Sequence, residues 1–195
     1  MKTKIHEYQK NINILMSKKK LVSLLIVISL SSFAQTKMIT KTGKLTFEAS
    51  VPAFEEVKAK NESATVVLNP STGEIASLAL VKGFRFKVAL MEEHFNENYM
   101  ESDSYPKATF KGKIENFDVT KLTATAKDYT IKGKMEMHGK SKDITIPASI
   151  KKTSDGIEID SNFTLNTEDY GIDIPSVVSK KVSKKVAVKF GATLK

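Results

Sequence analysis

Apolar and polar residues alternate along most of the chain, and this alternation is the sequence feature that most limits how the chain can fold. The alternating runs occupy residues 45–51, 84–90, 131–137, 144–150, 157–165 and 186–194. A period of two residues is typical of β-strands that bury one face and expose the other. A shift of one residue in any pairing would turn the apolar side chains out to solvent. The sequence therefore predicts an all-β protein with well-specified strand pairing.

Short turn sequences separate several of these runs. Residues 69–73 (NPSTG) predict a turn, residues 154–156 (SDG) predict a tight hairpin, and His138-Gly139 lies at or near another. Strands joined by such turns form a sandwich or a closed antiparallel barrel, and closure removes the exposed edge strands. We expect a single antiparallel barrel of about eight strands. One or two short helices are also expected, over residues 53–57 and 91–101.

The N-terminal residues have the order of a secretory signal peptide. Lysines at positions 18–20 precede an apolar run of ten residues, LVSLLIVISL at 21–30. Ser32-Phe33-Ala34 then places small residues at positions −3 and −1 of a cleavage site. The apolar run is shorter than the ~20 residues that a membrane-spanning helix needs. We therefore expect a signal peptide over residues 1–34, with Met16 as an alternative start. Residues 35–195 are expected to form one domain that is exported, to the periplasm or outside the cell.

The charge and the cysteine content limit the partners of this domain. Six basic residues and one acidic residue lie before Gln35, so the net charge falls from +9 for the whole chain to +4 for residues 35–195. That charge, without a basic stripe interleaved with aromatic residues, predicts no nucleic-acid partner. The cluster Lys180-Lys181 and Lys184-Lys185 is either a solvated turn or a weak, transient contact for anionic headgroups of a membrane surface. Because cysteine is absent, packing alone must hold the domain together.

Few residues have the spacing of a catalytic or metal site. His94 lies beside Glu92 and Glu93, but no second histidine follows three or four residues later, as a zinc site on a helix would need. No serine lies in a Gly-x-Ser-x-Gly turn, and no glycine-rich phosphate loop is present. The acidic residues around Asp169 and Asp173 have the composition of a turn. We therefore expect no enzyme activity, no metal and no cofactor.

Phenylalanine and methionine side chains gather on the apolar faces of the predicted strands. A packed core accounts for such residues, but methionine also suits a surface that must fit a flexible apolar ligand. A barrel of about eight strands either fills its interior with side chains or holds one ligand. The chain has no tryptophan, which leaves room for an elongated apolar cavity. The candidate lining residues are Phe84, Phe86, Phe110, Met135, Met137, Phe163, Leu165 and Phe190.

Three motifs, in order along the chain, resemble the YceI-like family. The first is EEHF at 92–95 followed by YPKATF at 105–110, similar to the family's D-E-H-L helix and Y-P-x-a-x-F. The second is GKMEMHGKSK at 133–142, similar to G-x-L-x-x-H-G-x-x-K. The third is FTLNTEDYGI at 163–172, similar to F-x-x-x-R-x-D-F/Y-G-I, with Thr167 where arginine is common. The family's D-x-x-H-S near its first strand is missing here, so the polar residues that would orient a ligand head differ.

This resemblance implies a lipocalin-like barrel whose interior tunnel holds a polyisoprenoid chain, an isoprenoid quinone or another long-chain lipid such as a fatty acyl compound. It implies binding without catalysis, for transport or storage in the cell envelope, commonly in the periplasm. A short helix would close one end, and His94 would anchor that end by hydrogen bonds or, with Tyr99, touch the ligand head. The alternative is a filled barrel without a lipid ligand, acting in stress response or binding a protein partner. The oligomeric state stays open, and a homodimer is one alternative.

Overall fold

The computed structural model describes residues 37–195, so the predicted signal peptide and the alternative start at Met16 lie outside the described residues. The strands are β1 (Met38–Ser50), β2 (Lys58–Leu68), β3 (Glu74–Leu80), β4 (Arg85–Phe86), β5 (Lys107–Ile114), β6 (Lys127–Met137), β7 (Lys140–Thr153), β8 (Gly156–Asn166) and β9 (Val182–Leu194). The helical elements are the α-helix α2 (Ala89–His94), the π-helical turn η2 (Phe95–Tyr99), and the 3₁₀ turns η1 (Val81–Gly83), η3 (Val119–Lys121) and η4 (Thr167–Tyr170).

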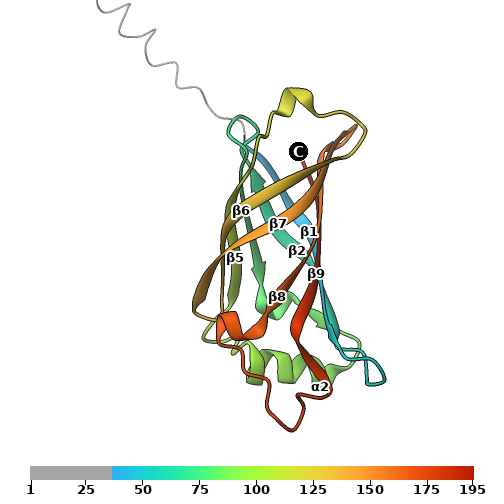
Figure 1. The fold of residues 1–195 in the computed structure, drawn as a ribbon, viewed down its shortest axis with the longest axis vertical. Helices are drawn as coiled ribbons and strands as arrows, with labels where there is room; N and C mark the ends of the chain where they lie inside the picture. The colour runs from blue at the N-terminus through green and yellow to red at the C-terminus, as the bar shows by residue number, and fades with distance from the viewer. Residues whose placement is uncertain (1–36) are drawn as a thin grey trace, which may run out of the picture. The chain divides into compact units, whose positions relative to one another are not determined.

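Eight of the strands close into an antiparallel barrel (Figure 1). Their order around the sheet is β1-β9-β8-β7-β6-β5-β3-β2, and β1 pairs back onto β2 to close it. The short strand β4 adds to one end of β2 through the pairs Ala59↔Phe86 and Lys60↔Arg85. The predicted fold class, an all-β antiparallel barrel of about eight strands, is confirmed.

The predicted turns join neighbouring strands. His138 and Gly139 form the two-residue loop between β6 and β7, and their φ angles are 49° and 69°. Two positive φ values match the type I′ turn, whose twist suits a hairpin. Thr153 pairs with Gly156 across the β7–β8 hairpin, and residues 69–73 turn between β2 and β3. These three turn predictions are therefore confirmed.

The predicted strand over residues 84–90 is wrong over most of its length. Only Arg85–Phe86 pair in the sheet, and α2 begins at Ala89. Leu90, expected on an apolar strand face, is 56% exposed. The alternation continues into residues that are strong helix formers, and helix propensity prevails there. The Glu92 carboxylate also accepts a hydrogen bond from the backbone N–H of Phe86 at 3.1 Å, so this N–H is not available to pair with another strand.

Of the two predicted helices, one is present and the other is absent. The helix expected over residues 91–101 is present as α2 and η2, over residues 89–99. The helix expected over residues 53–57 is absent, because the chain turns there and Ala53 has a φ of 72°, outside the right-handed helical region. One short helical segment, extended by a π-helical turn, therefore accompanies the barrel.

The interior of the barrel is filled at one end and hollow at the other. The filled end lies away from α2, near η3 and the C-terminus (Figure 1). Its buried cluster is Val66, Leu68, Ile75, Phe110, Ile114, Leu122, Ile131, Ile146, Ala148, Ile150, Ile157, Ile159, Ala192 and Leu194. Ile75, Phe110, Ile131 and Ile146 of this cluster also border the hollow. Aliphatic residues dominate this set, as expected where strands pack their inner faces together. The filled end supplies most of the core of the domain.

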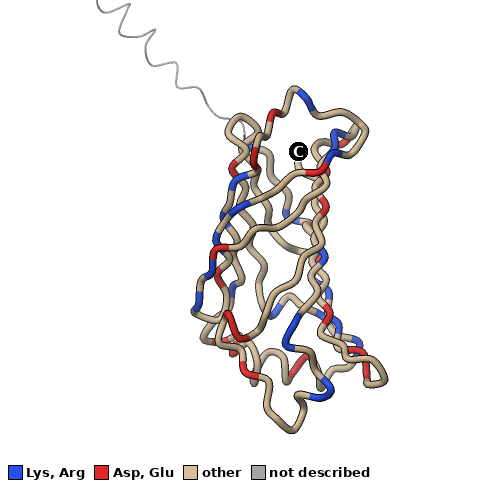
Figure 2. Tube along the Cα trace, viewed as in Figure 1, with Lys and Arg blue, Asp and Glu red and all other residues tan. Residues whose placement is uncertain are grey.

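Charged residues of both signs are spread along the strands and loops of the barrel (Figure 2). Many form exposed ion pairs, such as Lys132 Nζ with Glu115 Oε1 at 2.7 Å. Exposed pairs of this kind contribute at most about 1 kcal/mol each, so they matter more for solubility than for stability. Within residues 37–195, none of the helices is long and apolar enough to cross a membrane.

Candidate functional site

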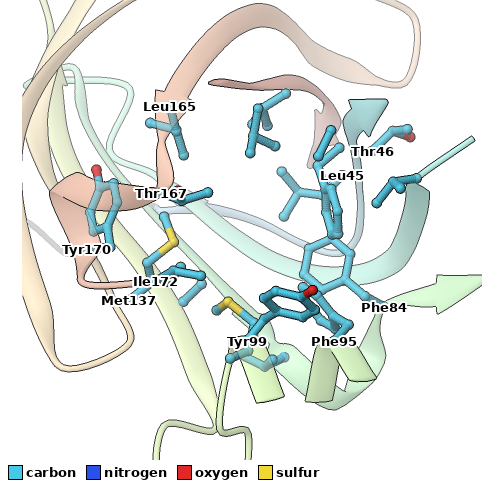
Figure 3. Close-up of a pocket in the computed structure, with 18 of the residues that line it drawn as sticks. Leu45, Thr46, Phe84, Phe95, Tyr99, Met137, Leu165, Thr167, Tyr170 and Ile172 are labelled. Carbon is cyan, nitrogen blue, oxygen red and sulfur yellow. The ribbon is translucent and has the colours of Figure 1, made fainter. Parts of the chain in front are cut away.

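The hollow end of the barrel encloses a cavity of about 400 Å³ beside α2 (Figure 3). The inward faces of β1, β3 and β5–β9 form its wall, and η1, α2, η2 and η4 lie around one end. The charged residues of the lining are Glu55 and Lys181, and both are exposed, as is the neighbouring lining residue His94. The cavity therefore carries charge only where it opens to solvent. Apolar walls with a few polar groups are typical of small-molecule binding sites.

All eight predicted lining residues border this cavity. They are Phe84, Phe86, Phe110, Met135, Met137, Phe163, Leu165 and Phe190. The two candidate head-group contacts, His94 and Tyr99, border it as well, at the end that α2 and η2 occupy. Alternation thus identified the face of the strands that points inward. That these side chains contact a ligand stays a prediction.

The cavity ends at a layer of side chains across the middle of the barrel. Phe110, Ile131 and Ile146 border the cavity at this layer. Further along β7, Ala148 and Ile150 do not border it and are only 3% and 1% exposed. The cavity is therefore a pocket with a closed inner end.

Four phenylalanine rings hold the helical segment against the barrel. The centroid of the Phe95 ring lies 5.3 Å from that of Phe47, 5.8 Å from Phe84 and 5.1 Å from Phe86. The Phe47 ring in turn lies 5.3 Å from Phe84 and 5.7 Å from Phe86. Aromatic pairs at about 4.5–7 Å attract each other beyond the effect of burial alone. Because these rings come from β1, the η1–β4 segment and η2, they join three parts of the chain at the cavity wall.

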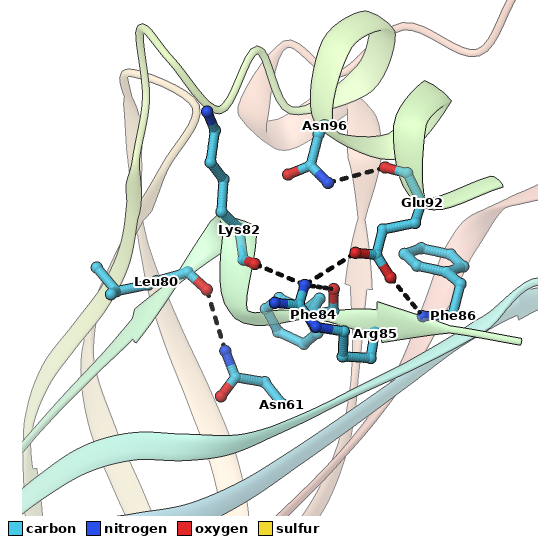
Figure 4. A network of polar contacts seen from close by, with 8 residues as sticks. All are labelled: Asn61, Leu80, Lys82, Phe84, Arg85, Phe86, Glu92 and Asn96. Carbon is cyan, nitrogen blue, oxygen red and sulfur yellow. Dashed lines mark hydrogen bonds and ion pairs between the residues drawn. The ribbon is translucent and has the colours of Figure 1, made fainter. Parts of the chain in front are cut away.

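Glu92 ties α2 to β4 through polar contacts (Figure 4). Its Oε1 accepts a hydrogen bond from Arg85 Nη1 at 2.8 Å, and its Oε2 accepts one from the backbone N–H of Phe86 at 3.1 Å. The same Arg85 nitrogen donates to the carbonyl oxygens of Lys82 and Phe84, at 2.8 and 3.2 Å. Both carboxylate oxygens of Glu92 therefore have structural partners.

The two histidines of the domain have different surroundings. His94 is exposed beside the cavity, and no hydrogen bond or ion pair joins its side chain to another residue in the range 37–195. His138 is the better anchored of the two: its Nδ1 lies 3.1 Å from Tyr170 O, and its ring centroid lies 4.8 Å from that of Tyr105. Its Nε2 lies 3.4 Å from Glu101 Oε1, an ion pair when the imidazole is protonated. The anchoring expected of His94 is thus provided by His138, which joins the β6–β7 loop to η4.

The turn η4 places two buried hydroxyl groups beside the cavity. Thr167 and Tyr170 both border it, and neither hydroxyl has a hydrogen-bond partner among residues 37–195. Burial, with the nearby charge of Asp169 adding to it, raises the pKa of Tyr170 to about 12. Since threonine occupies the position where the related motif commonly has arginine, η4 brings no positive charge to the interior.

The acidic residues of this turn form surface ion pairs. Asp169 Oδ2 lies 2.5 Å from Lys142 Nζ, and Glu168 Oε1 lies 2.6 Å from Lys184 Nζ. Within the part of the chain that the structure describes, no group of three His, Cys, Asp or Glu side chains is arranged to hold a metal ion. The carboxylates near η4 therefore act as structural partners of lysines.

Sequence reasoning did not name several other lining residues. Phe47 and Val188 lie in predicted alternating runs, so the same pattern could have identified them. Phe95 and Ile172 lie outside those runs, in η2 and after η4. Their position on the cavity depends on how the helical segment and η4 pack onto the barrel, which a local pattern does not encode.

Comparison with known proteins found a family and several solved structures. The family model of the YceI-like domain matches residues 29–194. A polyisoprenoid binding domain from Saccharophagus degradans, implicated in plant cell wall breakdown, superposes with a TM-score of 0.72 at 14% identity, over 82% of this chain and 97% of that one. BcnA of Burkholderia cenocepacia gives 0.62 at 18% identity, over 76% and 94%. The YceI protein of Campylobacter jejuni gives 0.50 at 18% identity, over 68% and 81%. No curated protein matches the chain by sequence.

Proposed function

Because the chain belongs to the YceI-like family, we propose that it binds one long-chain isoprenoid or related lipid in its cavity and catalyses no reaction on it. The observation that carries this proposal is the apolar hollow of about 400 Å³ in a barrel whose other half is filled. The S. degradans domain is described as polyisoprenoid binding, which supports an isoprenoid as the ligand. The tail of an isoprenoid quinone or a fatty acyl chain has the same apolar character and suits the same wall.

Burial of the apolar chain supplies the free energy of binding. Each methylene group that leaves water for the cavity contributes about 0.8 kcal/mol. The loss of translational freedom and of chain flexibility opposes this gain, so only the surplus appears as affinity. The predicted lining residues, from Phe84 at the helical end to Phe110 at the closed end, would supply most of the contacts.

The distribution of polar groups orients the ligand. At the closed end, Ser161 Oγ already donates to Pro147 O at 2.5 Å, so it offers no free donor. The charged residues of the lining are those at the opening, and His94 and Tyr99 also lie at that end. The tail of the ligand would therefore point inward, and its head would lie near His94 and Tyr99.

The cavity also suits binding better than catalysis. The YceI-like family generally binds ligands and does not transform them. Near the cavity, the carboxylates of Glu92 and Asp169 are held in ion pairs, and Glu55 and His94 are exposed.

Export and contact with a membrane complete the proposal. A signal peptide would bring the domain to the periplasm or outside the cell, where it would carry or store its ligand. Lys180, Lys181 and Lys185 lie in or beside the 174–182 segment that borders the cavity opening, and all three are exposed. This position suits a transient contact with anionic headgroups while the ligand enters or leaves. A homodimer is a further alternative that the oligomeric state in solution would decide.

Native mass spectrometry of the purified protein tests the proposal. A bound species that disappears after organic extraction and has the mass of an isoprenoid, quinone or fatty acyl compound is the expected result. An empty protein that stays empty after incubation with membrane lipids would overturn the proposal. That result would instead favour a module that binds a protein partner through its surface.

A further inference from the structure

Phe110 is an aromatic member of the layer of side chains that closes the cavity, together with Ile131 and Ile146. Phe110 borders the cavity and is only 5% exposed. Two residues further along β5 is Gly112, and opposite it on β6 is Gly133. Neither glycine borders the cavity. Phe110 is therefore the last side chain of β5 on the cavity, while on β6 the lining continues past Gly133 and ends at Ile131.

The Phe110 ring occupies the space that side chains of these two glycines would fill. A Cβ atom at Gly112 or at Gly133 would lie 2.7 Å from Phe110 Cζ. The same atoms would lie 2.7 and 2.4 Å from the carbonyl oxygens of Lys132 and Lys111, so the two strands leave no room for side chains there. The ring thus leans away from the opening and lies over the glycine pair. An aromatic ring over strand glycines is a recognised device that fixes the register of paired strands.

The depth of the hollow follows from the strands that line it. On β6 the lining runs from Ile131 to Met137, which is about 20 Å along a strand. A strand tilt of about 35–45° reduces this to about 15 Å along the barrel axis. The hydrocarbon core of a bilayer is about 30 Å thick, so a lipid chain in one leaflet spans about the same 15 Å. The hollow therefore matches a chain of one-leaflet length.

We propose that Phe110, held over the Gly112–Gly133 pair, sets the length of the apolar chain that this cavity encloses. The inference rests on the proposed function and specifies its substrate class, a single chain about as long as one leaflet. Polyprenyl chains much longer than this leave their remaining units outside, in water. Affinity then rises with chain length only until the chain reaches Phe110, because each enclosed methylene strengthens binding about fourfold.

A competition among prenols of increasing length tests this inference. The protein is mixed with geraniol, farnesol, geranylgeraniol and solanesol in mild detergent, with a fatty alcohol as a separate arm, and the bound species are weighed by native mass spectrometry. The wild-type protein should bind farnesol or geranylgeraniol more tightly than geraniol, and solanesol no more tightly than geranylgeraniol. Phe110→Ala should shift the preference toward the longer prenol by at least tenfold, because an isoprene unit is about as large as the phenyl ring that it replaces.

Two further variants provide a milder substitution at Phe110 and a control in the filled half of the barrel. Phe110→Leu removes less volume and should give a smaller shift in the same direction, and it replaces Phe110→Ala if that variant does not fold. Ile150→Ala removes a buried side chain from the filled half, away from the cavity, and should leave the order of preference unchanged.

The outcomes separate the two proposals. If the wild-type protein binds prenols, but affinity keeps rising to solanesol or neither Phe110 variant changes the order, the length limit is wrong and lipid binding stands. If the wild-type protein binds neither prenol nor fatty alcohol, both proposals are overturned.

Discussion

Removing the Phe95 ring should loosen the helical segment from the barrel while the barrel itself stays folded. Phe95→Ala eliminates three aromatic pairs, with Phe47, Phe84 and Phe86, at 5.3, 5.8 and 5.1 Å. Each pair contributes about 0.5–1.5 kcal/mol beyond burial. A fully buried Phe→Ala change costs about 3–5 kcal/mol, and Phe95 is only partly buried. We therefore expect the free energy of unfolding to fall by about 2–3 kcal/mol.

The measurement combines denaturant unfolding with hydrogen exchange. The midpoint of unfolding gives the total loss, and exchange at the amides of α2 and η2 shows where protection is lost. The increase in exchange rate should be larger at those amides than at the amides of β6 and β7, because the ring contacts join the segment to the barrel. Binding of a lipid should weaken as well, since the same ring borders the cavity.

Phe117→Ala is the matched control for this variant. Phe117 is also partly buried, and the ring partner described for it is Tyr129 at 6.0 Å, on the filled half of the barrel. The control should lose stability without faster exchange in α2. If Phe95→Ala costs less than about 0.5 kcal/mol, or if its exchange increases uniformly over the domain, the four rings do not hold the segment as we infer.

Three other perturbations test separate features. Met135→Lys should abolish lipid binding, because a lysine charge within the apolar wall would be desolvated without a partner; a variant that stays folded by circular dichroism and still retains lipid in native mass spectrometry would contradict the assignment of Met135 to the binding wall. The pKa of Tyr170 is about 12 in the folded state against 10.0 for an ordinary tyrosine, so the neutral phenol favours folding below pH 10 and this contribution is lost as the pH rises toward 12. Tyr170→Phe should therefore flatten the fall of Tm with pH over that interval, and an equally steep fall in the variant would show that other groups cause it. Changing Lys180, Lys181 and Lys185 to glutamate should weaken sedimentation with anionic vesicles by about 1 kcal/mol per residue and leave neutral vesicles unaffected; unchanged sedimentation would mean that this cluster is only a solvated surface.

The fold could be predicted because its main constraint is local. Alternation over residues 131–137 and 157–165 fixes which side chains point inward, and the turns at His138-Gly139 and Ser154–Gly156 fix which strands pair. The inward set therefore contained all eight predicted lining residues. The same pattern failed at residues 84–90, where apolar spacing fits a strand and residue type fits a helix. The contact between Glu92 and Phe86 resolves that ambiguity, and it forms only after folding.

The division of the interior could not be predicted from the sequence. Ile131 and Ile150 look alike in an alternating pattern and belong to the same buried cluster, yet Ile131 borders the cavity and Ile150 does not. The difference depends on how much volume each layer of the barrel receives from all of its strands. The position of Phe95 likewise depends on the packing of a helical segment across the barrel opening. Both features depend on residues that are far apart in the chain, so a short stretch of sequence does not predict them.

Because one half of the barrel is filled, the cavity is a cup with a single opening and not a tunnel through the barrel. In the binding mode proposed above, a chain would enter tail first and leave head first by the same opening, so donor and acceptor would have to meet the protein at that one face. The protein would then exchange its cargo in alternating encounters and would not conduct a stream of molecules through itself. The rate of delivery would be set by how often the rim near α2 meets a partner or a membrane, and the filled end is left free to keep the domain folded while the cup stands empty.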